Sequence, residues 1–271
     1  YDNLFLAYKK ARKHITTKPY VLEFEKALEH NLLLLRSELL LHSYEPRPLV
    51  NFIIRDPKTR KISKSAFRDR VVHHALCNII EPIFEKRFIF DSYANRVGKG
   101  TLKAVQRFDF FKRKAGKNNT VKCYILKADI KKYFENIDYE ILLKIIRNKI
   151  ADARVIWLVR KILVNSSFQS RGMTLGNLTS QFFANVYLNE LDWFVKTNLK
   201  AKHYIRYVDD FVVLGENKAE LEILKVKIDN FLRKNLKVCL HPAKSKVYRL
   251  GNTFPFLGFR VFFYHKLLKK S

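Results

Sequence analysis

Two adjacent carboxylates, Asp209 and Asp210, interrupt a run of residues that otherwise favours β-strand. The run holds Tyr204 to Tyr207 before the acid pair and Phe211 to Leu214 after it, rich in β-branched and aromatic side chains. Aspartate is poorly suited to a strand interior but is tolerated in a turn, so we predict a hairpin with the acid pair at its bend. Such a turn can bring both carboxylates near one divalent cation, because phosphoryl-transfer sites use hard oxygen ligands.

A third acid, Asp129, ends a predicted strand over residues 121–130. Taken alone, an aspartate at a strand end is usually a turn or helix-cap residue. Together with the acid pair it suits a site for two metal ions about 3.5–4 Å apart. One ion would lower the pKa of an attacking hydroxyl, and the other would neutralise a triphosphate as charge develops.

The chain is strongly basic, with 53 Lys and Arg against 25 Asp and Glu, a net charge of +28. Such a surplus repels itself, and binding to a polyanion relieves the repulsion and releases counterions. The 22 Phe and 13 Tyr residues offer flat faces for base stacking. We therefore predict a nucleic-acid partner. A basic surface that serves solubility or an anionic membrane is the alternative.

The rest of the composition favours a globular intracellular protein. The chain has 271 residues, 48% of them hydrophobic, which is enough for a sizeable core. No uncharged apolar run approaches the roughly 18 residues expected of a membrane span. Three widely spaced cysteines form no metal-ligand pattern and indicate a reducing, cytoplasmic setting. We see no signal peptide, although the chain starts at Tyr1 without Met.

Periodicity and turn residues predict mixed helices and strands. We expect helices over 20–42, 67–87 (with Pro82 as a kink or break), 137–149, 154–164, 178–197 and 218–234. We expect a strand, a turn at Asp56-Pro57 and a second strand over 52–63, further strands near 237–240 and 256–263, and loops over 112–122 and 172–176. The order lacks strict βαβ alternation, which favours an α+β fold with an antiparallel sheet.

Two blocks carry a resemblance to a known family. The segment from Ala128 to Phe134 resembles the first metal-binding block of reverse transcriptases, and Tyr207 to Asp210 resembles the second. Further blocks follow in the order of that family along the whole chain. The resemblance implies right-hand polymerase fingers and palm, with an antiparallel palm sheet flanked by helices and a thumb that is absent or truncated. It implies mainly fingers over 1–120, mainly palm over 121–265 with a helical fingers segment near 138–170, and a possible start of the thumb over 266–271.

The resemblance also implies roles at the acids. Asp129 and Asp209 would bridge two Mg²⁺ ions, for which Mn²⁺ is a possible substitute, while Asp210 supports them and the Ile130 carbonyl adds a ligand. Phe134 stands at the steric-gate position, where a bulky ring excludes a 2′-hydroxyl and selects deoxynucleotides; ordinary core packing is the alternative for this ring.

Other residues would contact the nucleotide and primer by the same resemblance. The backbone amides of Lys132 and Tyr133 would face the triphosphate. Arg60 and Arg68 would bind its phosphates, because guanidinium offers paired hydrogen bonds to phosphate oxygens. Lys244 would assist the departing pyrophosphate, with Lys246 as the alternative.

A primer grip is implied at Phe256, Leu257 and Gly258. Gly258 would let backbone approach the primer closely, and a glycine in an ordinary strand bulge is the other interpretation.

A departure from the family pattern occurs over residues 172–181. Most reverse transcriptases have Gln-Gly in this loop, whereas this chain has Leu175-Gly176. Leucine cannot hydrogen-bond a nucleotide or template, so misinsertion should be penalised less. Simple packing is the alternative role for Leu175.

This string, together with residues 67–76 and 91–100, resembles the reverse transcriptases of diversity-generating retroelements, found in prokaryotes and phages. That group copies a template RNA into cDNA with errors at template adenines, uses a primer and deoxynucleoside triphosphates, and works with a basic accessory variability protein. A group II intron-type, retron-type or phage-defence reverse transcriptase is the first alternative, and a non-catalytic RNA-binding scaffold is the second.

Overall fold

The computed structural model describes residues 1–271 apart from 56–58, 167–169, 252–253, 263–264 and 269–271. The chain forms two compact units. The first unit holds residues 1–87 and 137–186, and the second holds residues 88–136 and 187–271. The segment near 138–170 thus groups with the N-terminal residues, while residues 88–120 group with the acid-bearing strands. The fingers and palm boundaries expected from the sequence stay a prediction.

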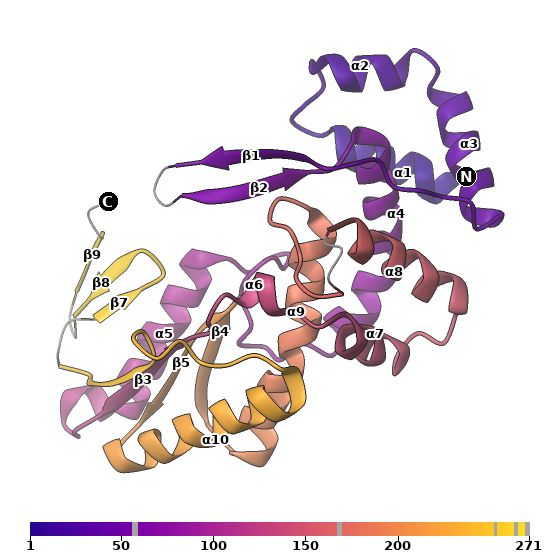
Figure 1. Ribbon diagram of the computed structural model, residues 1–271. Helices are drawn as coiled ribbons and strands as arrows, with labels where there is room; N and C mark the ends of the chain where they lie inside the picture. Colours follow the sequence, from indigo (N-terminus) through magenta and orange to yellow (C-terminus); the bar gives the residue numbers. More distant parts are fainter. Residues whose placement is uncertain (56–58, 167–169, 252–253, 263–264, 269–271) are drawn as a thin grey trace. The chain divides into compact units, whose positions relative to one another are not determined.

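The first unit is mainly helical and carries one long hairpin (Figure 1). Its helices are α1 (Asp2–Arg12), α2 (Pro19–Glu25), α3 (Leu28–Leu40), α4 (Phe67–Glu85), α7 (Tyr139–Arg147) and α8 (Ala153–Ser166). The hairpin pairs β1 (Val50–Ile54) with β2 (Arg60–Lys64). A core of Leu4, Tyr8, Leu32, Leu35 and Val71 joins α1 and α3 to α4.

The predicted helix over 20–42 is wrong as a single element, because α2 and α3 are separate helices. The chain leaves helical geometry at Ala27, with φ −130° and ψ 48°. The Asn31 side chain donates to the Phe24 carbonyl at 2.9 Å across this corner. The apolar spacing continued through the break because both helices turn buried residues to the same core.

Other predictions in this unit are confirmed. The strand–turn–strand over 52–63 is the β1–β2 hairpin, although its predicted bend at Asp56 and Pro57 lies outside the described residues. The long helix expected from residue 67 is α4, which continues past Pro82 without a break.

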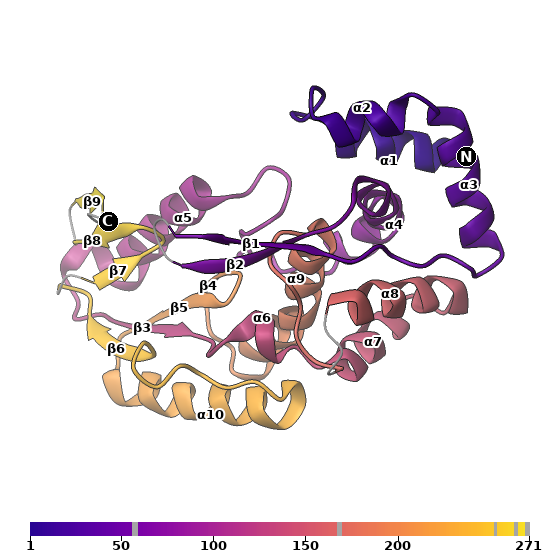
Figure 2. The same cartoon turned by 45° about the horizontal axis from the view of Figure 1, so that its top comes forward.

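The second unit is built on a four-stranded antiparallel sheet of order β4-β5-β3-β6. The strands are β3 (Tyr124–Asp129), β4 (His203–Tyr207), β5 (Asp210–Gly215) and β6 (Lys246–Arg249). Helix α10 (Lys218–Leu236) covers one face and α5 (Thr101–Ala115) covers the other (Figure 2). Both units contain residues of α9 (Leu178–Trp193), and α9 is extended by a π-helical turn over Phe194–Asn198.

A second, three-stranded sheet lies against α5. It consists of β7 (Phe254–Phe256), β8 (Phe259–Val261) and β9 (Lys266–Leu268), in that order. The Phe108 ring of α5 packs against Phe254 and Phe256, with centroids 5.7 and 5.2 Å apart. The short helix α6 (Tyr133–Asn136) and a 3-10 turn over Lys117–Asn119 complete the unit.

Two local predictions in this unit are wrong. The basic loop expected over 112–122 is partly helix, because α5 continues to Ala115 with Phe111 and Ala115 buried in the core. The strand expected near 237–240 is absent from the described residues there, apart from a single bridge between Ile130 and Leu240. The edge strand of the four-stranded sheet lies further along the chain, as β6. The α+β class and the antiparallel sheet are confirmed.

None of the helices in the described part of the chain is both long and apolar enough to cross a bilayer.

Candidate active site

The acid pair lies at the turn of the β4–β5 hairpin, as predicted. Tyr207 pairs with Asp210, which leaves Val208 and Asp209 as a two-residue turn. Val208 has φ +54° and Asp209 does not have a positive φ, the pattern of a type II′ turn. That position normally holds glycine, and a β-branched residue there is strained. The fold therefore maintains an unfavourable backbone conformation beside the carboxylates.

Buried side chains of the second unit hold this turn. Arg206 is fully buried, and its Nη1 donates to the Val208 carbonyl at 3.0 Å. Its Nε and Nη2 donate to the two carboxylate oxygens of Asp192 at 2.7 and 2.6 Å. Nη2 also reaches Ser92 Oγ at 3.2 Å, and the Tyr204 hydroxyl donates to Asp192 at 2.8 Å.

Sequence reasoning did not single out Arg206 or Asp192. The only signal for Arg206 was its place within a strand-forming run directly before the acid pair.

The sheet register brings the third acid to the same place. Asp129, the last residue of β3, is the direct partner of Asp210 in β5. The next amide, Ile130, donates to the Asp209 carbonyl at 3.2 Å, so Asp129 and Asp210 form a non-hydrogen-bonded pair. Residues in such a pair have Cα atoms about 4.5 Å apart and side chains on one face. The structure therefore brings all three predicted acids together.

Asp129 is anchored from the segment between α10 and β6. The His241 amide donates to the Asp129 carbonyl at 2.7 Å. The buried Ser245 hydroxyl accepts from the Asp129 amide and donates to its carbonyl, both at 3.3 Å. Lys244 Nζ donates to Asp129 Oδ1 at 3.2 Å. Lys244 thus lies at the acid cluster, whereas Ser245 was missed because nothing local marks a serine as an anchor.

The electrostatics at Asp210 are unfavourable for three free carboxylates. Burial raises the pKa of Asp210 to about 7; the Lys127 ammonium, 3.7 Å away, opposes this, and the charges of Asp129 and Asp209 add to it. Its Oδ1 is buried and has no hydrogen-bond partner among the residues that the structure describes. Crowded carboxylates with an unsatisfied oxygen are a setting that a divalent cation would relieve.

The oxygen donors of these residues suit a metal ion, although the side chains are not already arranged around one. Among the described residues no group of three or more His, Cys, Asp and Glu side chains is placed to hold an ion. Lysine ammonium groups instead contact Asp129 and Asp210. The donor set is all oxygen, as hard cations require. Asp129, Asp209 and Asp210 are the residues that would hold Mg²⁺.

The predicted ligand Ile130 and the predicted nucleotide contacts follow Asp129 directly. Ile130 is buried beside Leu240. Lys132 is exposed, has φ +46° and pairs with Glu135 at 3.3 Å. Tyr133 is buried, and the half-buried Phe134 ring lies edge-on to it at 5.4 Å. The Phe134 ring is therefore positioned by the Tyr133 ring, a few residues after Asp129.

The remaining predicted nucleotide contacts belong to the first unit. Arg60 is exposed on β2 opposite Ile54. Arg68, at the start of α4, forms an ion pair with Glu38 and lies over the Tyr44 ring. The sequence contained no signal for the Glu38 partner, which comes from α3.

Leu175 and Gly176 pack against the β1–β2 hairpin. The Ser63 amide of β2 donates to the Leu175 carbonyl at 2.8 Å. Gly176 has φ +112°, and a Cβ there would lie 2.6 Å from Ile62 Cγ2. Only glycine fits this position without a shift. The buried Asn177 side chain accepts from the Ser65 hydroxyl at 2.7 Å, a further contact not expected from the sequence.

The predicted primer-grip residues form a hairpin turn. Phe256 pairs with Phe259, and Leu257 and Gly258 between them have φ +47° and +85°. Positive φ at both positions is the type I′ pattern. A Cβ on Gly258 would meet nothing within 4 Å, so this glycine is explained by its turn rather than by a strand bulge.

Comparisons with known proteins agree with this geometry. The family model for reverse transcriptase (RNA-dependent DNA polymerase) matches residues 55–261. Protein YkfC of Escherichia coli is 27% identical over 88% of this chain and 71% of its own length. The group II intron-encoded protein LtrA of Lactococcus lactis is 23% identical over 81% of this chain and 47% of its own.

A solved structure shares the fold. Apo telomerase from Candida tropicalis superposes with a TM-score of 0.63 at 13% identity, over 84% of this chain and 49% of that one. The chain thus spans about half the length of LtrA and of the telomerase chain. Because the family match covers well over half of the residues, the chain belongs to the reverse transcriptase (RNA-dependent DNA polymerase) family.

Proposed function

We propose that this protein is an RNA-directed DNA polymerase whose metal ions bind Asp129, Asp209 and Asp210. The observation that carries the proposal is the β3–β5 register, which pairs Asp129 with Asp210 beside the Asp209 turn. Template RNA, a primer and deoxynucleoside triphosphates are the partners. The +28 charge supports a polyanionic partner of this kind.

Bound Mg²⁺ would acidify the primer hydroxyl and neutralise charge on the triphosphate during in-line displacement. The protein's own part is positional. Arg206 and the II′ turn fix Asp209, and Ser245 with the His241 amide fix the backbone of Asp129. Lys244 supplies a cation at the cluster that could donate a proton to pyrophosphate.

Primer extension on a defined RNA template tests this function. Asp209→Asn should lower the extension rate at least about a hundredfold, because metal binding loses a charged ligand. Glu222→Gln is the control, since Glu222 is partly exposed on α10, where it pairs with Lys225. Equal rates for Asp209→Asn and the unchanged protein would leave the RNA-binding scaffold as the better explanation.

Phe134 is proposed as the gate against ribonucleotides. Phe134→Ala should raise ribonucleotide incorporation relative to deoxynucleotide by roughly tenfold or more, because the lost ring leaves room for a 2′-hydroxyl. The ratio of kcat/KM values for the two nucleotide classes is the measurement. A changed stability with an unchanged ratio would assign Phe134 to core packing.

The finer proposal is an error-prone enzyme of a diversity-generating retroelement. Support comes from Leu175, which has an apolar side chain and whose carbonyl accepts a hydrogen bond from β2. The similarity to LtrA favours a group II intron-type enzyme as the second candidate. A basic accessory protein and a cytoplasmic location in a prokaryotic host go with the first candidate.

Sequencing the cDNA separates these candidates. Errors concentrated opposite template adenines favour the retroelement enzyme, and Leu175→Gln should then reduce them. Uniform low error rates, unaffected by Leu175→Gln, favour the intron-type enzyme.

A further inference from the structure

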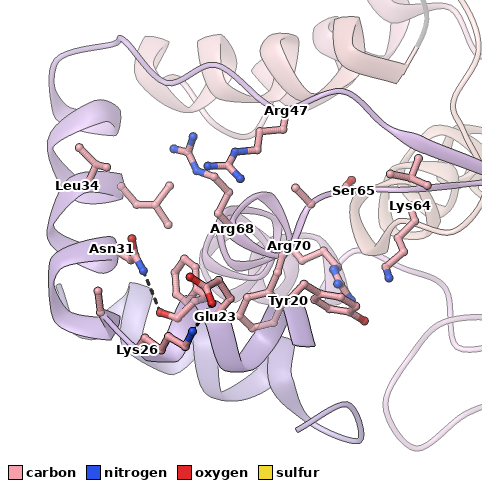
Figure 3. A pocket seen from close by; sticks show the side chains of 16 residues that line it. Tyr20, Glu23, Lys26, Asn31, Leu34, Arg47, Lys64, Ser65, Arg68 and Arg70 are labelled. Carbon is pink, nitrogen blue, oxygen red and sulfur yellow. Dashed lines mark hydrogen bonds and ion pairs between the residues drawn. The ribbon is translucent and has the colours of Figure 1, made fainter. Parts of the chain in front are cut away.

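The first unit contains a pocket to which the acid cluster contributes no residue, although Arg68, a predicted phosphate contact, is among its lining residues. Its volume is about 590 Å³, within the range that accommodates small ligands. Helices α2 and α3, the start of α4 and the neighbouring ends of β1 and β2 form its walls (Figure 3). Phe24, Leu34 and Leu35 give it an apolar side, and the Asn31–Phe24 hydrogen bond closes the corner between α2 and α3.

Positive charge collects in this pocket without matching carboxylates. Arg47, Lys64 and Arg70 line it, and none of them forms an ion pair with a described residue. The other two cations of the lining are neutralised, Lys26 by Glu23 at 2.8 Å and Arg68 by Glu38. Lys64 and Arg70 therefore remain for a ligand, whereas the buried Asp69 carboxylate offsets part of the charge of Arg47.

Arg70 is the most informative of these side chains. Its guanidinium carbon lies 5.1 Å from the centroid of the Tyr20 ring and 5.4 Å from that of Phe67. Its Nε and Nη2 are buried and have no hydrogen-bond partner among the described residues. Unsatisfied buried donors on a charged group cost stability, so the aromatic faces hold this cation at a cost.

Two further features favour an anion here. Burial by itself would raise the pKa of the Tyr20 hydroxyl, but Arg70 and Lys64 more than offset this and lower it. The N-terminus of the 19-residue helix α4 also lines the pocket, and its N-cap residue Ala66 provides no side-chain acceptor. First-turn amides and the helix dipole attract negative charge, part of which the buried first-turn carboxylate of Asp69 already supplies.

We propose that this pocket binds the oligophosphate group of a nucleotide, from either a free nucleoside triphosphate or the 5′-triphosphate end of an RNA. The excess of cations over carboxylates in this lining matches a group carrying several charges better than a single phosphodiester. The apolar side leaves room for the attached nucleoside. Arg60, the other predicted phosphate contact, does not line the pocket. Binding here requires neither polymerisation nor metal ions.

Titration without divalent metal tests the proposal. The full chain in EDTA is titrated with ATP, with a short 5′-triphosphorylated RNA and with the same RNA carrying a 5′-hydroxyl. We expect at least one triphosphate ligand to bind about tenfold or more tightly than the 5′-hydroxyl RNA. ATP binding identifies the free nucleotide as the source, and preference limited to the RNA identifies its 5′ end.

Variants separate the pocket from the polymerase site. Arg70→Gln and Arg47→Gln should each remove the triphosphate preference. Asp209→Asn should keep the preference, which distinguishes this site from the metal site. Arg233→Gln, at an exposed pair with Asp229, is the matched control.

Either of two results would overturn the proposal. One is the absence of any triphosphate preference in the unchanged protein. The other is a preference that survives in both pocket variants, which would leave Arg70 as a structural cation stacked on Tyr20.

Discussion

At the scale of single residues, Asp210 carries the main electrostatic conflict of the site. Its carboxylate faces Asp129 across the strands, and one of its oxygens accepts no hydrogen bond from the described part of the chain. Lys127 offsets only part of the burial penalty, and the pKa stays raised, at about 7. A protonated or metal-bound carboxyl is therefore more stable here than a free carboxylate.

We expect Asp210→Asn to stabilise the metal-free protein increasingly as pH rises. The folded-state pKa of Asp210, about 7, is above the usual 3.8, so its stabilising contribution is present below about pH 4 and lost as pH rises through 7. The variant should gain about 1–3 kcal/mol at pH 8 and much less at pH 4. Thermal unfolding in EDTA across this range is the measurement.

Adding Mg²⁺ at pH 8 should reverse the order, raising the Tm of the unchanged protein more than that of the variant. A stability difference that does not vary with pH would contradict the assigned pKa.

At the scale of elements, the acid turn depends on groups beneath it. The strained Val208 is held by Arg206, which is itself paired with Asp192 at the end of α9. The parallel bridge between Ser92 and Arg206 adds a further strand-like contact. The β4–β5 hairpin is therefore positioned by a buried polar network as well as by its ladder.

We expect Arg206→Met to destabilise the protein by about 3–5 kcal/mol, because Asp192 is left buried and unpaired. The double variant Arg206→Met, Asp192→Leu should recover most of that loss. Chemical denaturation of both variants is the measurement. Arg233→Met, which breaks an exposed pair, should cost less than about 1 kcal/mol. A double variant no more stable than the single one would argue against pairing as the cause.

The contact between the 172–177 loop and β2 gives a second test at this scale. Gly176→Ala should cost about 1–3 kcal/mol, because the added Cβ meets Ile62 and the φ of +112° is unsuited to alanine. Gly251→Ala is the control, since a Cβ there meets nothing within 4 Å. Thermal unfolding compares the two variants, and equal Tm values would show that the loop can shift away from β2 without loss of stability.

At the scale of the whole molecule, charge dominates. The net +28 is spread over a chain with many exposed basic side chains, and few of them form buried pairs. Such a surface favours association with a polyanion over the isolated state. In the proposed function, catalysis would depend on the acid cluster, whereas affinity for RNA would come from this excess charge.

We expect RNA affinity to fall roughly 10²- to 10³-fold between about 50 and 200 mM salt, because several neutralised phosphates release counterions. Filter binding with a single-stranded RNA at several salt concentrations measures the slope. An affinity independent of salt would remove the charge argument for nucleic-acid binding.

Local patterns in the sequence were enough to predict the separate parts of the site. Runs of β-branched and aromatic residues on both sides of Asp209 and Asp210 predicted the hairpin, and an apolar run predicted the strand ending at Asp129. These signals are local, because turn and strand preferences depend on neighbouring residues. The local pattern over 20–42 was misleading, because two separate helices bury residues in the same core and so keep one apolar spacing.

The contacts between these parts depend on the folded chain and could not be predicted from local patterns. The register that pairs Asp129 with Asp210, the hydroxyl of Ser245 on Asp129, and the Arg206–Asp192 pair all join residues distant in sequence. Strand register depends on which faces are buried across the whole sheet, and buried polar groups select partners only once the chain has folded around them. The cationic pocket at Arg70 has the same origin, because no spacing along the chain marks it.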